Sequence, residues 1–448
     1  MGLLKMGLYA QLLQYIPEVK GPTKKHLSFK EKLTWTGIIL VAFFVLGAVH
    51  IYGLGANGLS QFEFLSVVLG ASFGSIITLG IGPIVTGSIV LQLLQGAGIV
   101  NFDLSTHEGK SLFQGTQKVF TYAFIVIEAI IYVAMGGLSP MAGVGSWVLI
   151  LQIILGGIII VFMDDIINKY GFGSGVSLFI AAGVSQSIFI QALSPLRSVT
   201  NPEAFVGAVP EMLRLLSAGD PTGALIKLSA LVFTLLIFAL VVFAQAMKVE
   251  IPLSFGRIRG QGIRWPLQFI YTNVIPIILV SALVANLRLL ANFSKAQWVK
   301  NIVPYLTSNH LIQHVITGNA TAVTYIQAGT YILFFMAAST LFSWFWMQTS
   351  GLDPRSQAKQ MMQSGLQIPG FRKDARVLER LLKRYIYPLT IMGGLFIGFL
   401  ASVANLTGTF GSGTGLLLTV MIIYKLYEDI AKEHMSDMNP ALRKMMGR

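Results

Sequence analysis

About ten apolar runs, each close to 20 residues long, constrain the fold of this 448-residue chain more than any other feature. An α-helix needs about 20 apolar residues to cross the ~30 Å hydrocarbon layer of a membrane. Only 11% of the residues are charged, whereas soluble domains contain roughly 25%. The sequence therefore predicts an all-α polytopic membrane protein with ten spans. The expected spans are 33–53, 76–98, 117–136, 144–163, 174–192, 226–247, 267–289, 323–347, 387–405 and 414–430.

Lysine and arginine residues orient these spans. When the N-terminus is placed inside, only six of the 32 such residues fall on outer segments, namely Arg197, Arg214, Lys227, Arg288, Lys295 and Lys300. Cytoplasmic segments carry the excess of positive charge in membrane proteins, so we expect a multi-pass cell-membrane protein with both termini in the cytosol. Residues 1–32 lack a signal-peptide pattern and predict an amphipathic cytosolic segment on the membrane surface, and 431–448 predict a cytosolic tail.

A weak internal repeat divides the chain into an N-terminal half, 33–192, and a C-terminal half, 226–430, joined by an external loop, 193–225. The motif GFGSGVSLFIAAG opens the fifth predicted span, and GSGTGLLLTV opens the tenth. Pro83 and Pro276 lie inside the second and seventh spans. Because the members of each pair are five spans apart, the two halves should cross the membrane in opposite directions. Inverted repeats of this kind place the functional site between the halves.

Two long cytosolic loops, 248–266 and 348–386, carry more basic residues than membrane orientation requires. One interpretation is that their charge only fixes the topology. The other is that they project into the cytosol and dock an anionic partner such as a ribosome, because arginine-rich surfaces bind phosphates.

Motifs for enzymes and metal sites are poorly supported. The chain has no cysteine, which excludes disulfides and thiolate metal sites. The GASFG motif at 70–74 matches the nucleophile motif of hydrolases, but it lacks the preceding strand and the histidine partner. His310 and His314 have the spacing of two metal ligands on a helix, without a third ligand. We therefore expect no enzyme activity, no metal and no cofactor.

An acidic pair, Asp164 and Asp165, follows the fourth predicted span. Such a pair could take up a proton inside a membrane protein, or it could lie at the interface and face a nearby cation. We expect the second arrangement, with Lys169 as the cation.

Polar residues inside the spans mark a candidate interior. Glu128 lies in the middle of the third span, where an ionisable side chain indicates a functional interior unless a neighbouring helix satisfies it for packing alone. Thr86 and Asn273 lie at comparable depth in the second and seventh spans.

A glycine-flanked segment, about 57–70, is too short to cross the membrane. Backbone that does not span is tolerated at that depth only where protein encloses it or where it lines a cavity, so we expect a short re-entrant helix and a central cavity. In the next span Ile81 and Val85 are four residues apart and share one helix face, as do Val176 and Ile180 in the fifth span.

Five motifs, taken together, carry a resemblance to a known family. They are LGIGPIVTGSIVLQLLQG, KYGFGSGVSLFIAAGVSQ, RIRGQ followed by YTNVIPIIL, GLDPRSQAKQ, and GSGTGLLLTV. In this order they resemble the SecY family of protein-translocation channels in its archaeal form, from about Ile16 to the C-terminus. The resemblance implies two five-helix halves around an hourglass pore that conducts unfolded polypeptide. It also implies a constriction ring of six apolar side chains, which are Ile81, Val85, Val176, Ile180, Ile278 and Leu418.

The same resemblance implies moving parts and partners. Segment 57–70 would be a plug, with hinge glycines Gly58, Gly70 and Gly74. Spans two, three, seven and eight would form a lateral gate that releases membrane segments into lipid, with a polar cluster of Thr86, Glu128 and Asn273. The ribosome would dock on Arg257, Arg259 and Arg372. A SecE (gamma) subunit and a small beta subunit would complete a heterotrimer that handles signal sequences and nascent polypeptides.

The sequence thus favours a passive protein-conducting channel. The alternative from another class is a secondary transporter for a small solute, which can also be built on an inverted repeat. A transporter should present converging polar ligands at the membrane midplane, whereas the candidate pore residues are aliphatic. An intramembrane protease is a more distant alternative.

Overall fold

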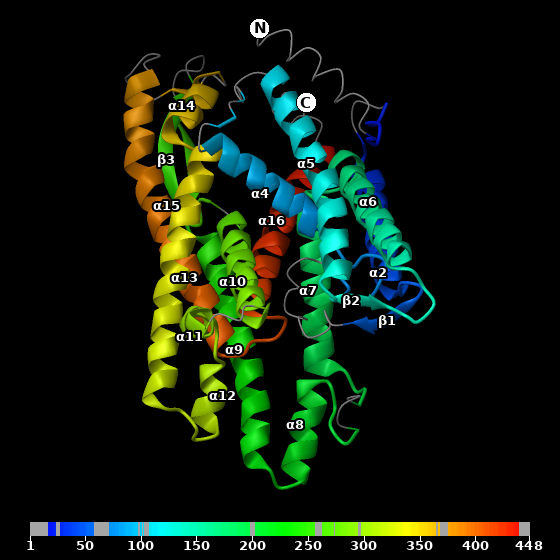
Figure 1. Ribbon diagram of the computed structural model, residues 1–448. Helices are drawn as coiled ribbons and strands as arrows, with labels where there is room; N and C mark the ends of the chain where they lie inside the picture. Colours follow the sequence, from blue (N-terminus) through cyan, green and yellow to red (C-terminus); the bar gives the residue numbers. More distant parts are fainter. Residues whose placement is uncertain are drawn as a thin grey trace. The chain divides into compact units, whose positions relative to one another are not determined.

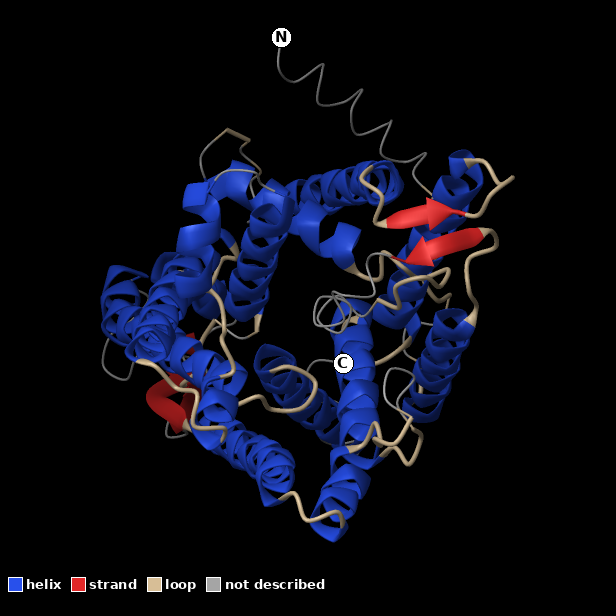
Figure 2. Ribbon diagram, turned by 60° about the horizontal axis from the view of Figure 1, so that its bottom comes forward, coloured by secondary structure: helices blue, strands red, loops and turns tan. Residues whose placement is uncertain are grey.

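Helices make up most of the chain in the computed structural model, and strands are confined to two small sheets (Figure 2). The structure describes residues 17–23, 27–57, 71–96, 99–100, 102, 107–197, 202–255, 262–272, 274–293, 297–363, 366–367 and 375–438. The chain forms two compact units, 1–185 with 422–448, and 186–421. Two helices, α7 and α16, pass from one unit into the other. The predicted class, an all-α polytopic protein, is confirmed.

The first unit contains the helices of the N-terminal half (Figure 1). Its elements are α2 (Phe29–Ala48), β1 (Leu54–Asn57), α4 (Gly82–Gly96), α5 (His107–Ala134), β2 (Leu138–Pro140), α6 (Ser146–Tyr170), the first part of α7 (Gly175–Leu193) and the last part of α16 (Gly413–Met438). Ser28 begins α2 with a reciprocal cap, in which its hydroxyl accepts from Glu31 N and Glu31 Oε2 accepts from Ser28 N. The end of α16 returns to this helix, where Lys32 is paired with Glu433.

The second unit contains the remaining elements (Figure 1). They are α8 (Ala208–Ser217), α9 (Pro221–Ala246), β3 (Lys248–Phe255), β4 (Gly262–Gln268), α10 (Ile275–Phe293), α11 (Gln297–Leu306), α12 (Leu311–Ile316), α13 (Ala322–Thr349), α14 (Pro354–Gln363), β5 (Leu366–Gln367) and α15 (Ala375–Leu406), with the first part of α16. Within it, α8 and α9 lie side by side and form a helical hairpin (Figure 1).

Each predicted span overlaps one helix, in the order α2, α4, α5, α6, α7, α9, α10, α13, α15 and α16. Among the described residues, seven helices are long and apolar enough to cross a membrane, and α4 is a shorter apolar helix. The count of ten spans stays a prediction.

Three predicted boundaries are wrong for identifiable reasons. The first helix ends at Ala48 because the chain becomes extended at Val49 and His50 then forms a β-bridge with Ser75. The second helix begins at Gly82 rather than 76, because the preceding residues form turns that include Gly80 at φ +52°. The seventh span does not begin at 267, because β4 continues its ladder with β3 to Gln268.

Pro83 and Pro276 lie at the starts of their helices and not inside them, where the predicted spans placed them. Each is the second residue of its helix, after Gly82 in α4 and Ile275 in α10. Proline is favoured in the first helical turn because its missing N–H would have no intrahelical partner there. The two prolines therefore start equivalent helices of the two halves.

The loops 248–266 and 348–386 contain regular structure with a core of its own. Strands β3 and β4 form an antiparallel hairpin, and β5 pairs with β3. Helix α14 and the start of α15 lie within the second loop (Figure 1). These elements and the end of α13 share a buried cluster made of Ile251, Leu267, Met347, Ala358, Met361, Leu378, Leu382, Ile386 and Leu389. The loops are thus anchored to the ends of the helices that they connect.

Candidate functional site

Residues 71–81, which precede α4, are mostly buried and form turns. Backbone groups at this depth must find partners inside the protein, and side chains of the segment provide them. The Thr78 hydroxyl donates to Ser75 O at 2.5 Å and accepts from Gly74 N at 3.1 Å, while the Ser72 hydroxyl donates to Gly47 O at 3.0 Å. Gly74 has φ +92°, a conformation that glycine adopts without strain. The segment is therefore held in an irregular path.

Helix α6 leaves room for this path through two glycines. A Cβ on Gly156 would lie 1.8 Å from Ile76 O, and a Cβ on Gly157 would lie 2.9 Å from a methyl carbon of Ile125 on α5. Both distances are far below ordinary contact. The irregular segment therefore meets the backbone of α6 at Gly156, where only glycine fits, and the Ile125 side chain leaves little room at Gly157.

The irregular segment delivers Ile81 to the start of α4. Ile81 is 1% exposed and lies one residue before the helix, and its carbonyl accepts the Val85 N–H at 3.1 Å. The two residues are thus one helical turn apart, as predicted, although Ile81 precedes the helix.

The predicted ring residues occupy matched positions in the two halves. Val85 is three residues after the start of α4, and Ile278 is three residues after the start of α10. Ile180 is five residues after the start of α7, and Leu418 is five residues after the start of α16. Ile180, Ile278 and Leu418 are buried, while Val85 and Val176 are half-buried. The first unit carries Ile81, Val85, Val176 and Ile180, and the second carries Ile278 and Leu418.

Two residues of the predicted polar cluster meet between α4 and α5. The Thr86 hydroxyl lies within hydrogen-bonding reach of the Glu128 carboxyl. Helices α4 and α5 approach closely here: a Cβ on Gly87 would lie only 2.9 Å from Thr121 N. Two residues further along α4, the Ser88 hydroxyl accepts from Gln117 Nε2 of α5 at 2.5 Å. The structure therefore brings Thr86 and Glu128 together along a polar seam.

The third residue of this cluster, Asn273, lies outside the described residues. Its neighbour Thr272 is 1% exposed, and its hydroxyl donates to Ser343 Oγ on α13 at 3.1 Å. Sequence analysis missed this contact, because a threonine at the edge of a span and a serine inside another carry no motif. Also outside the described residues are Gly58, Gly70, the plug segment beyond Asn57, and the docking residues Arg257, Arg259 and Arg372.

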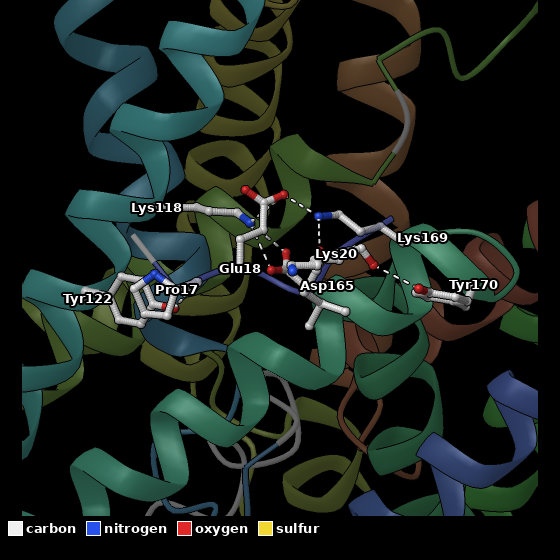
Figure 3. Close-up of polar contacts among 9 residues, drawn as sticks. Pro17, Glu18, Lys20, Lys118, Tyr122, Asp165, Lys169 and Tyr170 are labelled. Carbon is white, nitrogen blue, oxygen red and sulfur yellow. Dashed lines mark hydrogen bonds and ion pairs between the residues drawn. The ribbon is translucent and has the colours of Figure 1, made fainter. Parts of the chain in front are cut away.

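A short N-terminal segment, Pro17–Lys20, is bound to the middle of α5 and the end of α6 (Figure 3); we call it the strap. The Tyr122 hydroxyl donates to Pro17 O at 3.1 Å, and the Tyr170 hydroxyl donates to Lys20 O at 2.8 Å. Its acidic residue, Glu18, lies between two lysine side chains that come from different helices. The strap thus connects two helices of the first unit.

The ion pairs at the strap correct the prediction for the acidic pair. Lys169 binds Glu18 and Val19 O rather than Asp165 (Figure 3). Lys118 donates to both carboxylate oxygens of Asp165 at 2.9 Å and lies 3.4 Å from Glu18. The hydrogen bond from Lys169, assisted by the charge of Lys118, holds the pKa of Glu18 below its ordinary value despite partial burial.

The other acid of the pair, Asp164, accepts the Val176 N–H at 2.9 Å. Its contact is therefore made with the first turn of α7, the helix that carries two predicted ring residues. This contact was not predicted from the sequence. Asp164 and Val176 are separated by eleven residues that include the end of α6, so no helical spacing relates them.

Metal-binding clusters are absent from the part of the chain that the structure describes. His310 has φ 49° and precedes α12, so His310 and His314 are not two residues of one regular helix. Burial and the nearby Arg288 charge lower the pKa of His310.

Comparison with known proteins gives one consistent result. The profile of the SecY family matches residues 75–427. The "Protein translocase subunit SecY" of Methanothermobacter thermautotrophicus is 45% identical over 98% of both chains, and that of Methanocaldococcus jannaschii is 40% identical over 98% of this chain and 99% of its own.

Solved structures agree. "The structure of a protein conducting channel" matches with a TM-score of 0.80 and 39% identity, and "Sec61 in the Canine ribosome-channel complex from the endoplasmic reticulum" matches with 0.78 and 38%; both cover 96% of this chain and 98% of their own.

Proposed function

The chain belongs to the SecY family of protein translocase subunits, and we propose that it forms the pore through which unfolded polypeptides cross the membrane. The observation that carries this proposal is the matched placement of the aliphatic residues Val85 and Ile278, and of Ile180 and Leu418, on equivalent helices of two halves. An apolar constriction excludes water and therefore ions, while its aliphatic side chains can move aside for a polypeptide. With Ile81 and Val176, these residues make the proposed ring.

The proposed gate follows from the contacts between helices. Thr86 and Glu128 join α4 to α5, and Thr272 and Ser343 join the segment before α10 to α13. These four helices are the proposed lateral gate, through which hydrophobic segments would pass into lipid. Asn273 would belong to its polar cluster. The plug would be 57–70, moving on the hinges at Gly58, Gly70 and Gly74.

The proposed assembly includes several partners. A SecE (gamma) subunit and a small beta subunit would complete the complex in the cell membrane, with both termini in the cytosol. The buried core shared by the two loops supports docking of a ribosome at Arg257, Arg259 and Arg372, and one solved relative is the Sec61 channel of a ribosome-channel complex. In this proposal the chain conducts and does not catalyse, so the driving force comes from a partner, and no cofactor is needed.

The proposed domains are those expected from the sequence. These are the N-terminal segment 1–32, the halves 33–192 and 226–430, the external loop 193–225 and the tail 431–448. The alternative of a small-solute transporter gains no support from the relatives named above, which are translocase subunits and channels.

Cysteine crosslinking tests the pore, because the chain contains no cysteine of its own. Ile278→Cys and Leu418→Cys should each crosslink to a nascent chain stalled in the membrane. The matched controls are Leu283→Cys on α10 and Ile423→Cys on α16, whose native side chains are 37% and 49% exposed. Crosslinks of equal yield at ring and control positions, or none at the ring, would refute the proposed pore.

A further inference from the structure

The first turn of α7 is held by a side chain from the preceding helix. Asp164 on α6 accepts the Val176 N–H through Oδ1 at 2.9 Å. The contact is close, because a Cβ on Gly175 would lie 2.6 Å from the same Oδ1 atom and 2.7 Å from Asp164 Cα. The start of α7 is therefore pressed against the backbone of α6.

The first turn of α16 is held in a similar way in the second unit, where the Ser412 hydroxyl also accepts from Gly415 N at 3.0 Å. Asn405, near the end of α15, accepts through Oδ1 the N–H of Gly413 at 3.0 Å and that of Thr414 at 3.4 Å. A Cβ on Gly413 would lie 2.3 Å from Asn405 N. The Asn405 amide also donates to the Tyr331 hydroxyl on α13 at 2.9 Å, which fixes its orientation.

The two contacts, that of Asp164 with α7 and that of Asn405 with α16, lie at corresponding positions of the two halves. Each uses an oxygen of an Asp or Asn side chain on the helix before, and each helix starts with a glycine. Glycines with φ of +70° and +67°, Gly173 and Gly411, lead into the two starts. Because these contacts are described within separate units, each is an independent observation of the same arrangement.

A cap from a neighbouring helix fixes position as well as stability. The first N–H groups of a helix have no intrahelical acceptor, and an ordinary cap residue from the same chain segment moves with its helix. Here the acceptor belongs to another helix, so it sets the axial position of the first turn. A shift by one residue would move a side chain by about 1.5 Å along the axis and rotate it by about 100°.

The residues placed by these caps are predicted ring residues. Val176 is itself the residue whose N–H is held by Asp164, and Ile180 follows one turn later. Leu418 follows one turn after Thr414, whose N–H is held by Asn405. The caps therefore fix the axial position of three ring side chains, those of Val176, Ile180 and Leu418.

We propose that Asp164 and Asn405 are positioning residues of the channel, which keep α7 and α16 in the register that closes the apolar ring. This inference rests on the proposed function. The equivalence of Asp and Asn in the two halves indicates that the shared acceptor oxygen is essential, rather than the negative charge.

The resting ion conductance of the reconstituted complex in planar bilayers tests the proposal. Asp164→Ala and Asn405→Ala should each raise it about fivefold, the factor that corresponds to the loss of one helix cap worth about 1 kcal/mol. Asp164→Asn keeps the acceptor that Asn405 provides in the other half, and should retain wild-type conductance. The matched control is Ser402→Ala, one turn before Asn405, whose buried hydroxyl bonds only to Phe399 O of its own helix among the described residues.

The outcomes separate positioning from general destabilisation. Equal leakage in Asp164→Asn and Asp164→Ala, or wild-type conductance in both alanine variants, would overturn the proposal. If Asp164→Ala does not fold, Asp164→Glu takes its place, because it keeps the charge but displaces the acceptor; leakage in this variant but not in Asp164→Asn supports the proposal. Failure of the proposed function has a different result, since Leu418→Cys would then not crosslink to a nascent chain in any background.

Discussion

The close approach of α6 to the irregular segment before α4 makes Gly156→Ala a sensitive test of the fold. The added Cβ would lie 1.8 Å from Ile76 O, whereas ordinary contact begins at 3.4 Å. The nearest atom belongs to the backbone, so no side-chain rotation can relieve the overlap. Overpacking of this kind costs about 1–3 kcal/mol, and we expect the upper end. The replacement of a helical glycine by alanine returns about 1 kcal/mol.

The net expectation is a loss of about 2 kcal/mol for the first unit, which lowers Tm by roughly 4–8 °C in a unit of about 200 residues. Thermal unfolding of the purified protein in detergent measures the change. Gly329→Ala is the matched control, because Gly329 lies within α13 and a Cβ there meets no atom within 4 Å. It should unfold at the wild-type temperature or slightly above it. If Gly156→Ala behaves like this control, the described path of residues 71–81 against α6 is wrong.

Two further predictions concern carboxylates that lie outside the membrane spans, Glu18 and Glu211. The pKa of Glu18 is lowered in the folded protein, so its ion pairs stabilise the fold fully above the ordinary pKa of 4.5. This stabilisation is lost as pH falls through the lower folded pKa. Glu18→Gln should therefore lower Tm at pH 7, and the difference in Tm from wild type should shrink below about pH 4.5. Glu108→Gln, an exposed carboxylate at the start of α5, is the control, and an equal loss there would contradict the strap. On α8, Glu211 accepts from Phe205 N at 2.7 Å and from the Arg214 guanidinium at 2.6 Å. Glu211→Gln should therefore speed amide hydrogen exchange at Phe205, and unchanged exchange would show that this bond does not hold the loop.

The nature of the helices could be predicted from the sequence, but their first residues could not. Apolar run length identifies a membrane helix because the thickness of the hydrocarbon layer sets it. It does not distinguish an apolar helix from an apolar turn, so residues 76–81 were assigned to a helix that begins at Gly82. Pro83 and Gly80 signal this boundary once the preference of proline for the first turn is considered.

The candidate site was predictable where residues act through local spacing. Ile81 and Val85 share a turn because four residues separate them, and the resemblance to a family supplied the matching positions in the other half. Contacts between distant segments were not predictable in this way. Asp165 and Lys169 have the spacing of a helical ion pair, yet the buried Asp165 pairs with Lys118, and Lys169 binds the strap. A buried carboxylate is stabilised by the cation that can reach both of its oxygens.

The shared core of the loops has a mechanical consequence. Ile251 of β3 and Leu382 of α15 are completely buried in the same cluster as Met347 at the end of α13. Within the membrane α13 and α15 stay in close contact, since a Cβ on Gly398 would lie 2.8 Å from Met336 Cα. The β3–β4 hairpin is therefore joined through one buried core to two long helices that pack closely against each other. We expect a displacement of the hairpin to be transmitted to both helices together.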